Sequence, residues 1–175
     1  MKKKKSSLGI FFIVSLVVLT ISGCSSSPNG LRDPLLTWQD HAMIYPITIN
    51  RSYPHASTTD DTTGKTAEFE KDKVGLIPPG TRTLKIYVHK DSAGRDVWNA
   101  DPVYISQNFQ SGERYVLTGD LQIADFFLTS GTVTVKLLTV DEYRSVYTGS
   151  NEDFQTMIVG RFNWAENEFK KNKIK

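Results

Sequence analysis

The chain contains a single cysteine, Cys24, so no disulfide bond can form within it and its fold must depend on a packed core. It also lacks a long hydrophobic run. The longest, Leu8–Ile21, has about 14 residues, fewer than the roughly 20 that a helix needs to cross the hydrocarbon core of a bilayer. The sequence therefore argues against a permanent membrane-spanning helix.

Motifs that carry catalysis or bind cofactors are missing. The chain has many serines but no Gly-x-Ser-x-Gly elbow, and it has neither a phosphate-binding loop nor a dinucleotide fingerprint. The acidic pair Asp141-Glu142 is adjacent in sequence, so its two carboxylates do not converge on one bond. We expect a non-catalytic protein with no catalytic residues and no cofactor.

Histidine is scarce as well. The three histidines, His41, His55 and His89, lie 14 and 34 residues apart, without the close pairing typical of zinc sites. We interpret them as single surface residues. Asp60-Asp61 does not match the spacing of a calcium loop, and turn aspartates usually bind their own backbone. We therefore expect no metal site.

A surplus of positive charge is absent from most of the chain. Without the four lysines Lys2–Lys5, the 21 basic residues fall to 17 against 19 acidic ones, a net charge of −2. Such a body offers no electrostatic footprint for nucleic acid and no polybasic patch for anionic lipid. We expect no nucleic-acid partner.

The amino terminus carries the most specific signal in the sequence. Lys2–Lys5 precede the apolar run, and Ile21-Ser22-Gly23-Cys24 follows it. This arrangement resembles the signal peptide and lipobox of bacterial lipoproteins. The resemblance implies that diacylglycerol is attached to the Cys24 sulfur, that the chain is cut before Cys24, and that the new amine is acylated, with palmitate among the acyl chains. The alternative is an uncleaved helix that ends in a free cysteine.

The resemblance also implies a cellular location and a domain organisation. Residues 1–23 would be the signal peptide, 24–33 a lipidated tether and 34–175 a single β-rich domain. The protein would be anchored to the cell membrane through acylated Cys24, on the extracytoplasmic side. In lipoproteins an aspartate after the cysteine favours the inner membrane, so Ser25 favours the outer membrane if the cell has two.

Alternation of apolar and polar residues predicts a mainly β fold. It is clearest where Leu84, Ile86 and Val88 alternate with polar residues, and residues 121–128 fit a strand better than the alternative helix. We predict an antiparallel β-sandwich, with a small β-barrel as the alternative. The predicted strands lie within residues 44–49, 74–77, 83–89, 103–106, 115–118, 132–140, 143–148 and 156–162.

Two further segments complete the predicted domain. Residues 52–72 contain few apolar side chains and are predicted to form a long polar surface loop. A short C-terminal helix is predicted from Asn163, because Asn163 and Glu166 resemble a capping box and lysines follow near the end.

The centre of the chain carries a second resemblance. Residues 76–80, Leu-Ile-Pro-Pro-Gly, lead into the alternating strand of residues 84–88. This resembles the proline-glycine turn and strand of PEGA-type and other small envelope sandwich domains. It implies a β-sandwich but no functional residues.

Two tyrosines are candidates for a binding surface. Tyr87 and Tyr104 fall on the polar phase of their predicted strands, where a large, stiff side chain can anchor a partner. The alternative is that they only favour the sheet or face a covering element. Our leading hypothesis is a lipoprotein that binds an envelope protein or serves a structural role at the membrane surface. The second is a small-molecule or glycan binder.

Overall fold

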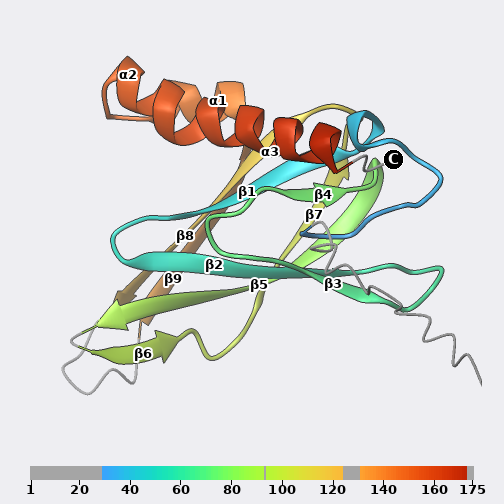
Figure 1. Cartoon of the computed structure of the whole chain (residues 1–175). Helices are drawn as coiled ribbons and strands as arrows, with labels where there is room; N and C mark the ends of the chain where they lie inside the picture. Colours follow the sequence, from blue (N-terminus) through green and yellow to red (C-terminus); the bar gives the residue numbers. More distant parts are fainter. Residues whose placement is uncertain (1–28, 93, 124–130, 173–175) are drawn as a thin grey trace, which may run out of the picture.

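The computed structural model describes residues 29–92, 94–123 and 131–172. The predicted signal peptide, Cys24 and the first half of the predicted tether, residues 24–28, lie outside this range, as do residues 124–128 of the ambiguous segment. The described chain is mainly β, as predicted, with two sheets and a long C-terminal helix (Figure 1).

Nine strands and three α-helices follow one another along the described residues. Their bounds are β1 Ala42–Thr48, β2 Ser52–Thr59, β3 Thr66–Phe69, β4 Gly75–Ile77, β5 Gly80–Ser92, β6 Arg95–Trp98, β7 Val103–Phe109, β8 Arg114–Ile123, β9 Gly131–Thr139, α1 Val140–Val146, α2 Asn151–Phe154 and α3 Gly160–Lys171.

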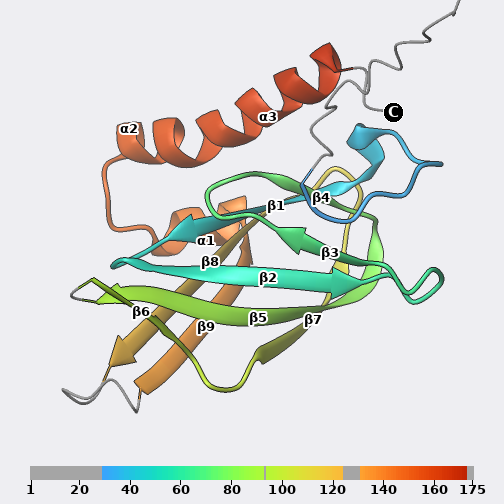
Figure 2. The same cartoon turned by 60° about the horizontal axis from the view of Figure 1, so that its bottom comes forward.

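Sheet A has the order β4-β1-β8-β9 and sheet B the order β3-β2-β5-β6, with β7 also pairing with β5 (Figure 2). All pairs are antiparallel except β1 with β8. The parallel pair arises because the chain leaves β1 for the other sheet. Asn50 and Arg51, both with positive φ, make the tight turn into β2.

The segment 52–72 is not the long surface loop that the sequence predicted. It holds β2 and β3, which pair from Ala56 with Phe69 to Thr59 with Thr66, so only residues 60–65 form the connection. Asp60 closes this turn, because its Oδ1 accepts the backbone N–H groups of the residues two and three positions later, both at 2.8 Å.

The loop prediction was wrong because hydroxyl side chains occupy buried positions of β2. Ser52 and Thr58 are buried, as are Pro54 and Ala56 between them. Ser52 Oγ accepts the Leu121 N–H at 3.2 Å, and Thr58 Oγ1 donates to a carbonyl of β5 at 3.0 Å. A buried hydroxyl with a hydrogen-bond partner behaves as a core residue, which a count of apolar residues misses.

The two sheets pack face to face over a shared apolar core. Gly119 in β8 allows a close approach, since a Cβ there would lie 2.8 Å from Val88 Cγ2 and 3.3 Å from Pro54 Cβ. The buried residues of this core are Ala42, Ile44, Ala56, Phe69, Ile77, Leu84, Ile86, Phe109, Tyr115 and Leu117.

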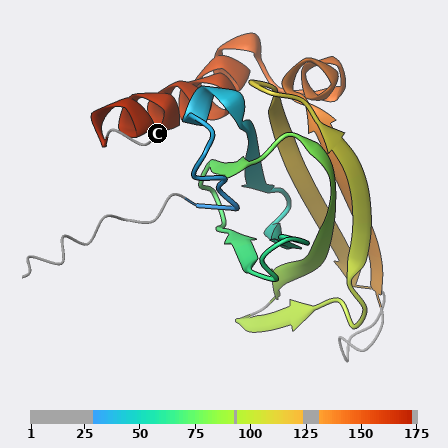
Figure 3. The same cartoon turned by 90° about the vertical axis from the view of Figure 1, so that its right-hand side faces the viewer.

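A second core lies on the other side of sheet A, under the C-terminal helix, so the domain has three layers: helix, sheet A and sheet B (Figures 1 and 3). The helix contributes Phe154, Ile158, Phe162, Ala165 and Phe169. Sheet A and the segments beside it contribute Trp38, Met43, Tyr45, Ile47, Val74, Leu76 and Val116.

The C-terminal helix is longer than predicted. It runs from Asn151 to Lys171, through a π-helical turn at Gln155–Val159 that joins α2 to α3. The predicted strands at 143–148 and 156–162 are wrong, because these residues lie in or beside α1 and in this helix. The N-cap of this helix is Ser150, whose hydroxyl accepts the Asp153 N–H at 3.0 Å, and not Asn163.

Candidate functional site

The solvent-facing side of sheet B carries a cluster of rings. Side chains on β2 and β5 alternate, so that the buried set faces the core and the other set faces outward. We call the outward set, together with its neighbours on β6 and β7, the outer aromatic face. It consists of Tyr53, His55, Tyr87, His89, Trp98 and Tyr104.

Both tyrosines predicted as a candidate surface lie on this face. Tyr87 is opposite His55, and Tyr104 is opposite Lys85, two positions from Tyr87 on β5. Tyr104 is 63% exposed, while Tyr87 is half-buried. Strand pairing therefore brings the two predicted residues to one surface, where Tyr104 remains open to a partner.

Tyr104 also lines a hollow of about 520 Å³ at one end of the outer aromatic face. Its rim is polar and carries two cations, Arg82 and Lys85, and one carboxylate, Asp61. Thr83 and Ser106 share a hydrogen bond of 2.8 Å between their hydroxyls beside it. The surface around Tyr104 is thus concave and rich in hydrogen-bonding groups.

At the other end of the outer aromatic face, His89 lies between Tyr53 of β2 and Trp98 of β6. Its ring makes tilted contacts with the rings of Tyr53 and Trp98, with centroid distances of 4.5 and 4.6 Å. Its Nε2 lies 2.7 Å from Asp96 Oδ1, while its Nδ1 is buried with no hydrogen-bond partner among the described residues. His89 is 5% exposed, so the prediction of a surface histidine was wrong here.

Trp98 is the most exposed ring of this cluster, with 48% of its surface accessible to solvent. Tyr53 below it is held by Lys71, whose Nζ lies 4.4 Å from the ring centroid. Burial raises the pKa of the Tyr53 hydroxyl above its usual value, and the nearby Asp96 charge acts in the same direction. The phenol therefore stays neutral and available as a donor at physiological pH.

His41 lies elsewhere and has a structural role. It is fully buried next to β1, where Nδ1 lies 2.7 Å from the Thr37 carbonyl oxygen and Nε2 accepts the Asp33 N–H at 3.0 Å. These two contacts assign the proton to Nδ1. The prediction that His41 lies on the surface was therefore wrong.

Within residues 29–92, 94–123 and 131–172, no group of three or more His, Cys, Asp or Glu residues is placed to hold a metal ion.

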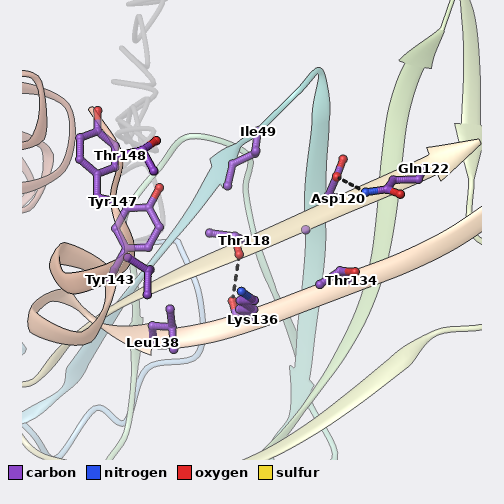
Figure 4. A pocket seen from close by; sticks show the side chains of 12 residues that line it. Ile49, Thr118, Asp120, Gln122, Thr134, Lys136, Leu138, Tyr143, Tyr147 and Thr148 are labelled. Atoms are coloured by element: carbon purple, nitrogen blue, oxygen red, sulfur yellow. Dashed lines mark hydrogen bonds between the residues drawn. The ribbon is translucent and has the colours of Figure 1, made fainter. Parts of the chain in front are cut away.

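A second concave site opens on the helix-facing side of sheet A (Figure 4). This pocket of about 520 Å³ lies between β8, β9 and α1. Its lining is Ile49, Thr118, Gly119, Asp120, Gln122, Thr134, Lys136, Leu138, Tyr143, Val146, Tyr147 and Thr148.

The pocket has an apolar end and a polar end. Tyr143 and Tyr147 of the α1 region, 5.8 Å apart between ring centroids, form the apolar end with Leu138. Asp120 and Gln122 lie at the polar end, joined by a hydrogen bond of 3.4 Å. The arrangement suits a small ligand with one apolar and one polar part.

Neither this pocket nor the ring cluster around His89 was predicted from the sequence. The pocket depends on α1, which was predicted to be a strand. The cluster depends on the pairing of β5 with β6, which places Trp98 opposite His89. The alternation of Tyr53, His55 and Ser57 with buried small residues was the available signal, but the segment was interpreted as a loop.

No helix in the part of the chain that the structure describes combines the length and the apolar character needed to cross a bilayer. Comparison with known proteins yields no match to any family model, curated protein or solved structure.

Proposed function

We propose that this chain is a bacterial envelope lipoprotein, anchored by acyl chains on Cys24, whose β domain binds another envelope protein and performs no catalysis. The observation that carries the binding role is the outer aromatic face, where Tyr104 and Trp98 are 63% and 48% exposed. Large exposed rings on a rigid sheet are the residues that dominate binding energy at protein interfaces.

The anchor is supported by Ile21-Ser22-Gly23-Cys24 after a short apolar run. Each buried methylene of an acyl chain contributes about 0.8 kcal/mol, so two or three chains hold a protein firmly on a bilayer. Gly30 and Asp33 already hydrogen-bond to the domain, so the few residues between Cys24 and Gly30 would keep the domain, and hence its partner, near the membrane surface.

Metabolic labelling with a fatty acid tests the anchor. Wild-type chain should incorporate the label and fractionate with membranes, whereas Cys24→Ser should do neither. Equal labelling of both forms, or a wild-type chain that retains Lys2–Lys5 after export, would contradict the lipoprotein assignment.

Crosslinking in intact cells tests the binding surface. Tyr104→Ala and Trp98→Ala should each reduce capture of a partner at least tenfold, the effect of losing about 1.4 kcal/mol or more. Met157→Ala is the matched control, because Met157 is 59% exposed on the C-terminal helix, away from sheet B. Equal capture by all three variants would rule out this face as the interface.

A second candidate function is binding of a small molecule or glycan. The pocket beside Tyr143 and Tyr147 favours it, as does the exposed indole of Trp98, which makes an edge contact with Tyr53. Tyr143→Ala should abolish ligand binding in the pocket, and Trp98→Ala should abolish sugar stacking on the outer face. A thermal-shift screen of purified wild type and both variants separates the two sites.

A further inference from the structure

Strand β9 is the outermost strand of sheet A and pairs with β8 alone among the described strands (Figure 2). It has nine residues, whereas the edge strands β3, β4 and β6 have four, three and four, and β7 has seven. Natural proteins protect long edges with proline, with several charges or with a bulge. β9 contains no proline and one charged residue, Lys136.

The hydrogen bonds around β8 show which backbone groups of β9 point outward. Leu121 N–H donates to Ser52 Oγ at 3.2 Å, and the Leu121 carbonyl accepts from Lys90 Nζ at 2.7 Å. Ser52 lies opposite Ile49, just after β1, and β1 and β9 flank β8 on opposite sides. The backbone groups of Leu121 therefore point away from β9. Because this direction alternates along a strand, Thr118 directs its groups toward β9.

Thr118 is the register partner of Lys136, so Lys136 directs its backbone groups toward β8. By the same alternation, the N–H and C=O groups of Val133, Val135 and Leu137 face outward from the sheet. None of these groups has a hydrogen-bond partner among the residues that the structure describes. The edge therefore presents an unbroken set of backbone donors and acceptors.

The side chains of β9 suit a copy of the same strand. Val135 and Leu137 lie half-buried against the core between the sheets. Val133 is half-buried on the same face by alternation, while Thr134 and Lys136 are exposed on the other face. An antiparallel copy centred on Val135 would oppose Val133 with Leu137, and Thr134 with Lys136. Apolar residues then meet apolar residues on one face, and no two charges of the same sign lie opposite each other.

We propose that β9 pairs antiparallel with β9 of a second copy of this chain, with Val135 opposite Val135, so that two copies of sheet A form one continuous sheet. This register uses all residues from 131 to 139. A shift of one hydrogen-bonded step shortens the pairing to 131–137 or to 133–139, and the latter places Lys136 opposite Lys136. The inference does not depend on the anchor or on the outer aromatic face.

Disulfide trapping in the full chain tests the register, in a Cys24→Ser background that removes the natural thiol. Directly opposed hydrogen-bonded residues have Cα atoms about 5.5 Å apart, within the range that a disulfide spans. Val135→Cys should therefore form a covalent dimer under mild oxidation. Thr132→Cys is the matched control on the same strand, because its two copies would lie about 20 Å apart.

The expected result is dimer formation at least about tenfold faster for Val135→Cys than for Thr132→Cys. Equal rates would overturn the proposal, and so would no crosslinking at either position. A maximum at Thr134→Cys or Lys136→Cys would overturn the register. Because Val135 is half-buried, circular dichroism must first show that its variant is folded.

A charge pair at an exposed position provides a second test that does not touch the core. Thr134→Lys would place two lysine pairs across the interface, whereas Thr134→Glu would place two Glu-Lys pairs there. Sedimentation equilibrium in detergent should show a dimer of Thr134→Glu about tenfold tighter than that of Thr134→Lys, with a smaller difference at high salt. Identical dissociation constants would overturn the proposal.

Discussion

At the scale of single residues, Gly119 sets how closely the two sheets approach. A Cβ at this position would lie 2.8 Å from Cγ2 of Val88, a stiff and fully buried side chain. We predict that Gly119→Ala destabilises the domain by about 1–3 kcal/mol, the cost of inserting a methyl group into a packed core. Urea unfolding measures it.

The matched control is Gly64→Ala, where a Cβ would meet no atom within 4 Å, although the positive φ of 67° adds a local cost. If Gly119→Ala is no more destabilising than Gly64→Ala, the close approach of the sheets at Gly119 does not limit stability.

Asp40 links stability to pH at the same scale. The Thr37 hydroxyl, which donates to Asp40 Oδ2 at 2.6 Å, holds the pKa of this carboxyl below its usual range, and the Thr37 N–H adds to the effect at 3.0 Å. A lowered pKa in the folded state stabilises the fold above about pH 4. That contribution is lost as pH falls through the folded-state pKa.

We predict that unfolding free energy falls between pH 5 and pH 2.5 in the wild type, and that Asp40→Asn makes this decrease smaller, because it removes the titrating group. Urea unfolding at the two pH values measures both. The pH dependence contributed by the other carboxylates should persist in the variant. If unfolding free energy falls as much with pH in Asp40→Asn as in the wild type, the contact between Asp40 and Thr37 does not contribute to the pH dependence of stability.

At the scale of elements, the C-terminal helix is fixed to sheet A by rings. Phe162 is fully buried and makes an edge contact with Tyr45 of β1, with ring centroids 5.9 Å apart. We predict that Phe162→Ala destabilises the domain by about 3–5 kcal/mol. Trp164→Ala, two residues away and 59% exposed, should change stability by about 0.5 kcal/mol or less. Similar losses for both variants would contradict this packing.

The same elements show how far the sequence predicts the fold. The strands β5 and β7 and the mainly β class follow from period-two alternation, since the exposure of their side chains alternates over part of their length. The strand predicted at residues 115–118 is also present, in β8, where it is buried on both faces. The helices between 140 and 162 do not follow. Thr156, Ile158 and Val159 favour strands locally, and only the packing of Ile158 and its neighbours on sheet A makes them helical.

The candidate site, like the fold, was predicted from the sequence only in part. Alternation placed Tyr87 and Tyr104 on outward faces, and the structure confirms that placement. It did not reveal that they share a sheet, because strand order is non-local information. Trp98 and His89 meet through the pairing of β5 with β6, and no local pattern encodes that contact.

At the scale of the whole molecule, the three layers depend on each other. The helix covers Met43, Tyr45, Ile47 and Val116 of sheet A, which would otherwise face water. We predict that a chain ending at residue 150 loses cooperative unfolding and binds a hydrophobic dye such as ANS, because an apolar sheet face is exposed. A truncated chain that still unfolds in one sharp thermal transition would show that the two sheets are stable without the helix.

The parallel pairing of β1 with β8 affects how the molecule folds. Residues that are about 70 positions apart meet there, from Met43 with Arg114 to Thr48 with Gly119. Such a topology has a high contact order, for which folding times of milliseconds to seconds are typical. Until β8 is in place, β1 has an open edge that other chains can contact. Slow folding, with a risk of self-association on the way, is therefore an intrinsic consequence of this strand order.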